Sequence, residues 1–354
     1  MKISLKQSYF DALSGTSFLP RWRCPVSVLF GGLILLWFGL FLLSLSLGSA
    51  AIPLDQVFRI ITHQDVQNSV WTQIIWQLRL PRAIAATFAG AALSIGGLQM
   101  QTLFNNPLAG PFVLGINSGA SLGVALVILG TGFLGGVLGN FSIAVAASTG
   151  AIAVLSLVLA ISRRVPHNAT LLILGLMIGY VSNSLVTLLL HFSPSEAMRL
   201  YLSWTFGSFA QIQREQLPIF ITLITVGGGL AYLCAKPLNA LLLGKQYAQS
   251  VGLDLKKIRR LLIVSTALLA GTVTAFCGPI SFIGIAVPHL CRGLLKTVNH
   301  RLLLPAVTLL GSSLALLADI IAQLPGSQLT LPLNTVTALF GAPIIIILIL
   351  RRYR

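Results

Sequence analysis

The sequence predicts an all-α polytopic membrane protein with about ten transmembrane helices. Of its 354 residues, 56% are hydrophobic and only 8% are charged, whereas an ordinary soluble domain is about 25% charged. So little polar surface cannot cover a soluble body, and the chain must use lipid as its solvent. The apolar residues form continuous runs long enough for a helix to cross a bilayer, which takes about 20 residues. These runs do not alternate as the strands of a membrane β-barrel do.

The predicted spans follow one another along the whole chain. They lie near residues 28–50, 82–104, 113–132, 141–162, 170–192, 217–235, 260–276, 279–297, 302–323 and 333–350. The first run could be taken for a signal peptide, but it is longer than a cleaved signal core of about 7–15 residues, so we expect it to be retained. The chain then divides into an N-terminal segment, 1–27, and one transmembrane domain, 28–354.

The net charge of +16 follows the membrane topology. If the N-terminus is cytoplasmic, the spans place five arginines outside and every other Lys and Arg inside. The outer five are Arg59, Arg79, Arg82, Arg199 and Arg214. This asymmetry is the positive-inside rule, and it predicts that both termini are cytoplasmic. The basic excess therefore orients the protein and does not indicate nucleic-acid binding.

The segment between the first two spans is expected at the outer surface. It mixes polar and apolar residues as an interfacial amphipathic helix does, and Trp71 and Trp76 would lie at the lipid headgroups. Pro81 suits the first turn of the second span.

The second span is poor in bulky side chains. Ala86, Gly90 and Ser94 recur every four residues, a spacing that lets helices approach closely in lipid. A helix with so many small residues is expected to be surrounded by other helices. Gln99 and Gln101 near its inner end are too polar for lipid, so we expect them to face protein or a water-filled path.

Prolines, glycines and asparagines interrupt the apolar pattern between the second and third spans, over Asn105–Gly123. Non-helical backbone at membrane depth is tolerated only where protein covers it or water reaches it. The stretch is therefore either a loop that lines the pore or lies beside a gate, or a tightly packed turn with structural glycines. The candidates for a translocation path or gate are Gln99, Gln101, Asn105, Asn106, Pro107, Gly115 and Asn168.

Two further connections between spans have sequences that predict short helices. The outer loop before the sixth span has room for one short helix. The inner segment 238–260 predicts two short helices, Leu241–Ser250 and Leu255–Arg260, with Gly244 and Gly252 as breaks. Such a segment lies flat under the membrane or docks on a partner.

Sites of covalent or metal chemistry are not indicated. The four cysteines form no CxxC pair, and His289 and Cys291, two residues apart on a helix, do not face the same side. The sequence has no GxxxxGK[ST] phosphate loop and no HExxH motif. We therefore expect neither enzymatic activity nor a cofactor in this chain, and any ATP must be bound by another polypeptide.

Asp319 is an acid inside an apolar span, near the outer end of the ninth. Intramembrane carboxylates are functional candidates, but no neighbouring His or Lys makes this one a proton relay. The structural alternative is an interhelical hydrogen bond or a pair with an outer arginine.

Several motifs in order carry a family resemblance. They are LRLPR, FNNPLAGPFVLGINSGASLG, KPLNALLLGKQYAQSVGLDLKKIRR, GPISFIGIAVPHLCR, HRLLLPAVTLLGSSLALLADIIA and LNTVTALFGAP. Together they resemble the FecCD family of ABC import permeases, which serve vitamin B12, haem and ferric siderophores. The resemblance covers essentially the whole chain and implies the type II ABC importer architecture in a bacterial inner membrane.

The resemblance also implies the partners and the substrate class. A second permease, identical or a paralogue, would complete the pathway, with two cytoplasmic ATPases that bind ATP and one periplasmic substrate-binding protein. The expected substrate is an iron complex, either a ferric siderophore or haem, with vitamin B12 as the alternative. An ion-coupled secondary transporter is a weaker alternative, because it would need several intramembrane ionisable groups.

Two sets of residues are assigned by the resemblance. Arg79 and Arg82 would accept carboxylates of the binding protein, although snorkelling to lipid phosphate is the alternative. Segment 238–260 would form the coupling helices that contact the ATPase, with anionic lipid as the competing partner. Its named residues are Leu241, Gly244, Lys245, Gly252, Lys256 and Lys257. Gln323 and Thr330 stand where the family often has Arg and Glu, so a second docking contact is missing or moved.

Overall fold

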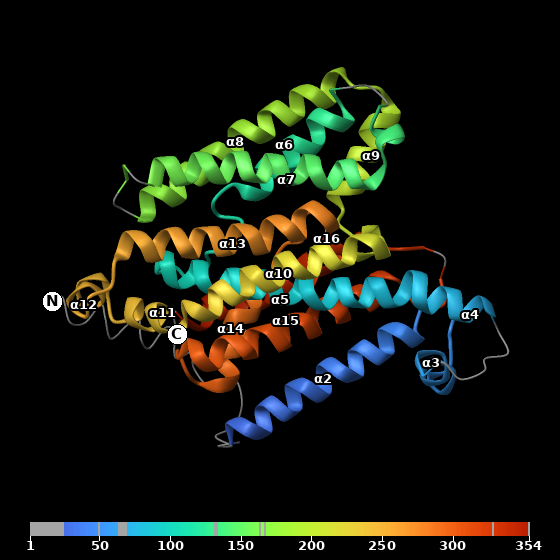
Figure 1. The fold of residues 1–354 in the computed structure, drawn as a ribbon, viewed down its shortest axis with the longest axis horizontal. Coiled ribbons are helices and arrows are strands. Elements are labelled where there is room, and N and C mark those ends of the chain that lie inside the picture. The colour runs from blue at the N-terminus through green and yellow to red at the C-terminus, as the bar shows by residue number, and fades with distance from the viewer. Residues whose placement is uncertain are drawn as a thin grey trace.

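A computed structural model of the protein (Figure 1) describes residues 25–48, 50–62, 69–130, 134–162, 164–165, 168–327 and 329–352. Within these ranges the chain forms helices and no strands, which confirms the all-α prediction. The helices that match the predicted spans are α2 (Val26–Ser46), α5 (Leu80–Phe104), α6 (Ile116–Ile128), α7 (Leu134–Ser162), α8 (Asn168–Phe192), α10 (Leu217–Leu233), α13 (Leu255–Cys277), α14 (Ile283–Leu295), α15 (His300–Ala322) and α16 (Leu333–Arg352).

Two of the predicted spans are much shorter helices than the hydropathy suggests. Helices α6 and α14 have 13 residues each, which is about 20 Å of helix at 1.5 Å per residue, against a hydrocarbon core of about 30 Å. Each follows a mostly buried stretch of non-helical backbone, 109–115 before α6 and 278–282 before α14. The expected boundaries 113–132 and 279–297 are therefore wrong at their starts, because Gly and Pro residues break the helix inside an apolar run.

Helix α5 is the centre of the bundle and packs against α10, α13, α14 and α15 (Figure 1). Its small residues permit this. A Cβ added at Gly90 would collide with the Gly311 carbonyl on α15, and one at Gly97 would collide with the Gly284 carbonyl on α14. The prediction of a helix enclosed by others is confirmed.

Helix α5 does not begin afresh at the membrane. The short helix α4 (Ser69–Gln73) and the π-helical turn η1 (Ile74–Arg79) run directly into it, and Pro81 lies in its first turn. Another short helix, α3 (Leu54–Ile61), precedes them and buries Val57 and Ile60. The expected interfacial segment is thus two helices, and the second is an extension of the span.

The two ends of the bundle carry different short helices (Figure 1). At one end lie α3, α4 and α9 (Ser195–Thr205), which is the single helix expected in the outer loop. At the other lie α11 (Ala235–Leu242) and α12 (Lys245–Ser250). We call these the outer and inner ends, following the charge asymmetry.

The inner segment breaks where the sequence indicates, with left-handed backbone at Gly244 (φ 108°) and Gly252 (φ 81°). Two predicted boundaries are wrong. The first short helix begins at Ala235, so Leu241 lies near its end. The stretch Leu255–Arg260 is the beginning of α13 and not a separate helix.

Candidate functional site

At the outer end, Asp319 on α15 holds Arg82 on α5. The Arg82 Nε and Nη2 donate to the two carboxylate oxygens at 2.9–3.0 Å, and Gln323 Nε2, one turn further on, donates to Oδ2 at 2.9 Å. The Asp319 side chain is only 1% exposed. The structural alternative for Asp319, a pair with an outer arginine, is the one observed. Gln323, the position that departs from the family pattern, completes the carboxylate's hydrogen bonds.

Arg79 is also occupied, at the end of α2. Its Nη1 donates to the carbonyls of Leu45 and Ser46, both at 2.8 Å, and its Nη2 donates to the Ala50 carbonyl. The side chain is 7% exposed. A guanidinium that satisfies the last carbonyls of a helix stabilises the turn there. Arg79 therefore fixes the connection between α2 and α3.

The docking role of Arg79 and Arg82 stays a prediction. Their hydrogen bonds within the chain leave few donors for a partner. Both guanidinium groups are engaged within the chain, with Arg82 18% exposed. Arg59, Arg199 and Arg214 are exposed at the same end. An acidic partner would reach these three without breaking an internal hydrogen bond.

Gln99 faces protein, which was one of its two predicted environments. Its Nε2 donates to Ser265 Oγ at 3.1 Å, and its Oε1 accepts from Thr266 Oγ1 at 2.8 Å, both on α13. Ser265 Oγ lies 2.8 Å from the Gly227 carbonyl of α10. This fully buried cluster ties three helices together.

Gln101 faces protein as well. Its Nε2 donates to the Ile285 carbonyl at 3.2 Å, and its Oε1 accepts from Arg292 Nη1 at 2.6 Å, so it joins α5 to both ends of α14. Arg292 is 4% exposed. A buried guanidinium needs hydrogen-bond acceptors, and Gln101 supplies one. A path or gate role for Gln99 and Gln101 remains untested.

A hydrogen-bonded chain links the inner end of α5 to α11. Thr102 Oγ1 lies 2.8 Å from His300 Nε2, and His300 Nδ1 lies 2.9 Å from Asn239 Oδ1 on α11. The same Asn239 oxygen accepts the His300 backbone N–H at 2.8 Å. His300 is 1% exposed. The chain is a direct connection from the inner short helices to the central helix.

The predicted gate stretch turns sharply and re-enters the bundle. Asn105 ends α5 with a left-handed φ of 51°, and Asn106 Oδ1 accepts the Leu108 N–H at 2.9 Å in the turn that follows. The Pro107 carbonyl pairs with His289 Nε2 at 2.9 Å. Gly115, with φ 76°, packs on the carbonyl of Gly175 in α8. The packed-turn alternative describes this geometry, and a gate role remains a prediction.

The remaining residues considered from the sequence are Asn168, His289 and Cys291. The side chain of Asn168 lies outside the described residues. His289 is occupied by the Pro107 carbonyl, and Cys291 is buried. Among the residues described, no group of three or more His, Cys, Asp and Glu could hold a metal ion.

The inner segment, 238–260, presents both charge and apolar surface. Lys245, Lys256 and Lys257 are exposed, and so are three apolar side chains. These are Leu243, Tyr247 and Val251, exposed by 44–54%. Asp254 caps α13 by accepting the backbone N–H groups of Lys256 and Lys257, and these hydrogen bonds, that of Lys257 first, hold the pKa of its carboxyl below the ordinary value. The segment therefore has a surface suited to the predicted contact with an ATPase.

A polar stripe on α8 was missed from the sequence. It consists of Tyr180, Asn183, Ser184, Thr187 and His191, which are all exposed. The spacing of three and four places them on one helix face. Ser184 and Thr187 donate to carbonyls of their own helix, whereas the Asn183 carboxamide has no partner among the described residues. Helical spacing of polar residues within an apolar run was the signal that could have found the stripe.

Comparison with known proteins identifies relatives along most of the chain. A family model, the FecCD transport family, matches residues 32–351. The vitamin B12 import system permease protein BtuC of Klebsiella pneumoniae is 41% identical over 280 residues, which is 78% of this chain and 82% of that one. That of Salmonella typhimurium is 39% identical over 283 residues, 79% and 84% of the two chains. A solved structure of a transporter described as of the metal-chelate ABC type, in an inward-facing conformation, superposes with a TM-score of 0.81 at 28% identity, covering 92% of this chain and 99% of that one.

Proposed function

The chain belongs to the FecCD transport family and is the permease subunit of an ABC importer, and from this premise we propose that it imports vitamin B12. Relatives of that name cover about four fifths of the chain at about 40% identity. The iron complex that the sequence first suggested becomes the second candidate. The structural likeness to a transporter of the metal-chelate type favours that second candidate.

The polar stripe on α8 carries the transport assignment. Asn183 and Tyr180 lie near the middle of a 25-residue apolar helix, where lipid cannot satisfy a carboxamide or a phenol. Polar groups at this depth face protein or water. We infer that the stripe faces a second permease, identical or a paralogue, and that the two copies enclose the translocation path there. Asn183, Ser184 and Thr187 have no ionisable group, which suits a large substrate that must be released again.

The inner short helices are proposed to receive the ATPase. Exposed Leu243, Tyr247 and Val251 supply apolar contact area, and Lys245 and Lys256 supply charge to steer a partner onto it. ATP would bind and be hydrolysed on that partner. Both termini of the permease would then lie in the cytoplasm, and the substrate-binding protein would dock at the opposite end.

The Thr102–His300–Asn239 chain supports a route for this coupling. A displacement of α11 by the ATPase would pull on Asn239, which is hydrogen-bonded to both the ring and the backbone of His300. His300 in turn contacts Thr102 on the central helix. Movement at the inner surface would thereby reach α5 directly.

Reconstitution tests the proposal. The permease, its ATPase and its binding protein are placed in liposomes with ATP on the ATPase side, and uptake of labelled cobalamin is measured against ferric siderophore and haem. ATP-dependent cobalamin accumulation that vanadate stops is expected. Accumulation of the iron complexes alone would assign the second candidate, and accumulation by the permease without its ATPase would overturn the ABC mechanism.

A further inference from the structure

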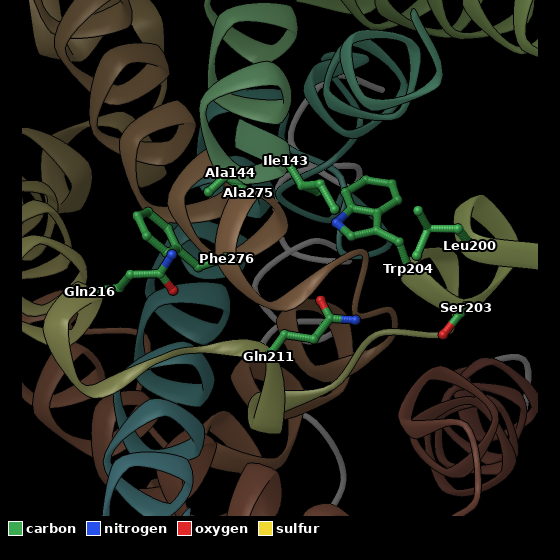
Figure 2. A pocket seen from close by; sticks show the side chains of 9 residues that line it. All are labelled: Ile143, Ala144, Leu200, Ser203, Trp204, Gln211, Gln216, Ala275 and Phe276. Atoms are coloured by element: carbon green, nitrogen blue, oxygen red, sulfur yellow. The ribbon is translucent and has the colours of Figure 1, made fainter. Parts of the chain in front are cut away.

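A small cavity lies at the outer end, between α7, α9, α13 and two 3-10 turns, η2 (Phe209–Gln211) and η3 (Arg214–Gln216) (Figure 2). Its volume is about 180 Å³. Figure 2 shows the nitrogen edge of the Trp204 indole and the carboxamide of Gln211 turned toward the space that separates Trp204 from Gln216. Phe276 forms part of the wall, and Ser203 lies at the exposed edge.

Two buried N–H donors line this cavity without a partner. The Trp204 Nε1 and the Gln216 Nε2 make no hydrogen bond to any described residue, and the two residues are only 4% and 5% exposed. The orientation of the Gln216 carboxamide is set, because its Oε1 accepts the Gln213 N–H at 3.1 Å and its Nε2 must point the other way. Buried donors without acceptors are rare in folded proteins. Two of them on one cavity indicate an occupant, either water or a ligand group, that brings the acceptor.

The lining selects among acceptors. No charged residue lines the cavity, so a carboxylate or phosphate would be desolvated without a counter-ion, which is costly. A hydroxyl offers an acceptor but only one donor. A primary carboxamide fits best: its oxygen accepts from Trp204 and Gln216, and its two N–H groups can donate to both the Gln211 carboxamide oxygen and the Ser203 hydroxyl.

The place of the cavity relates this ligand group to transport. The cavity opens beside α9, where Leu200 and Ser203 are exposed, and α9 follows directly after α8, which carries the polar stripe. Its volume is below the roughly 300 Å³ of the smallest ordinary ligand pockets, so it accepts a side group and not a whole substrate. Corrinoids such as cobalamin bear several primary carboxamide side chains around the ring.

We propose that the cavity binds a primary carboxamide side chain of the transported ligand at the outer end of the pathway. This rests on the proposed function for the identity of the ligand, whereas the chemistry of the cavity rests on Trp204, Gln211 and Gln216 alone. The two parts can be tested separately.

The first experiment tests the cavity with a small probe. The full chain, labelled with ¹⁵N at its 5 tryptophan indoles, is placed in nanodiscs, and its indole signals are followed by NMR while propionamide, propionate or propanol is added. Trp204→Phe assigns the signal of interest. A saturable shift of that signal with propionamide alone is expected. No shift, or an equal shift with propionate, would overturn the carboxamide site.

The second experiment identifies the source of the carboxamide. Trp204→Phe keeps a ring but removes the N–H, and Gln216→Met keeps the length of the side chain but removes both the N–H donor and the oxygen that accepts the exposed Gln213 N–H. In the reconstituted importer each should raise the KM for cobalamin several-fold, with the affinity for the binding protein unchanged. Trp37→Phe is the matched control, because the Trp37 Nε1 donates to Thr87 Oγ1, at 3.4 Å, away from the cavity.

The outcomes separate the two proposals. A weakened affinity for the binding protein with an unchanged KM would assign the carboxamide to an Asn or Gln of that protein and overturn the role in substrate binding. A propionamide response without any cobalamin transport would retain the carboxamide site but refute the proposed substrate. Normal cobalamin transport by Trp204→Phe without a propionamide response would refute this inference and leave the proposed function intact.

Discussion

Helices α5 and α8 have the same length, 25 residues, but their polar side chains lie in different environments. On α5, Gln99 and Gln101 are buried and every carboxamide contact is made within the chain. On α8, Tyr180 and Asn183 are exposed. A polar group in a membrane helix thus stabilises the fold where it has a partner, and indicates another protein chain or water where it has none.

The largest effect is expected from adding bulk to the enclosed helix. Gly97→Leu would force a side chain into the backbone of Gly284, where a Cβ already meets the Gly284 Cα at 2.9 Å. We expect a loss of about 3 kcal/mol or more, seen as poor recovery of folded protein. Gly229→Leu on α10, where a Cβ meets nothing within 4 Å, is the control and should be recovered normally. Equal recovery of both variants would contradict the packing described for α5.

The next effect is expected at the ion pair of α5. Arg82→Ala would leave the buried Asp319 carboxylate with Gln323 as its remaining side-chain partner, and breaking such a pair costs about 3–5 kcal/mol. Unfolding in mixed micelles measures the loss. The double variant Arg82→Leu with Asp319→Leu should recover most of the stability, because no buried charge remains. If the double variant is as unstable as Arg82→Ala, the loss of stability is not caused by breaking the ion pair between Arg82 and Asp319.

A smaller loss is expected at the neutral cluster of α5. Gln99→Leu leaves the Ser265 and Thr266 hydroxyls short of a partner, which costs about 1–3 kcal/mol. The same unfolding assay reports it. Adding Thr266→Val should reduce the loss, because the hydroxyl that donates to Gln99 Oε1 is removed as well. If Gln99→Leu left the stability unchanged but abolished transport, Gln99 would instead be assigned to the translocation path.

The exposed helix should respond in the reverse way. Asn183→Leu on α8 removes no hydrogen bond within the described part of the chain, so the stability of the isolated permease should change by no more than about 0.5 kcal/mol. Transport by the assembled importer should fall, because the polar face of the path is lost. Val181→Leu, an apolar exchange at an exposed position of the same helix, is the matched control and should transport normally.

Much of the architecture could be predicted because hydropathy and glycine positions are local signals. Hydropathy located the helices in order, and Gly244 and Gly252 marked the breaks in the inner segment. The short length of α6 could not be predicted, because Val113 and Leu114 are as apolar as helix residues but lie in a non-helical turn that protein covers. Apolar composition reports burial or lipid contact and not the backbone conformation.

The site residues were less predictable because they depend on long-range packing. The acceptors of Arg79 are backbone carbonyls some thirty residues away, which no side-chain motif records. Asp319 pairs with Arg82 across 237 positions, and only the shared outer position of the two hinted at it. Trp204 and Gln216 become a pair of donors only when α9 and the turn η3 meet at the same cavity.

Thiol accessibility on α8 tests most directly whether its polar stripe lines the path. In a cysteine-free permease assembled with its ATPase, Asn183→Cys and Leu35→Cys are labelled with a charged, membrane-impermeant methanethiosulfonate. Leu35, on α2, is 73% exposed on an apolar helix and serves as the lipid-facing control. We predict that the cysteine at 183 reacts much faster than the one at 35 and that trapping with ATP and vanadate changes its rate. Equal, slow labelling at both positions would place α8 in lipid and contradict the account.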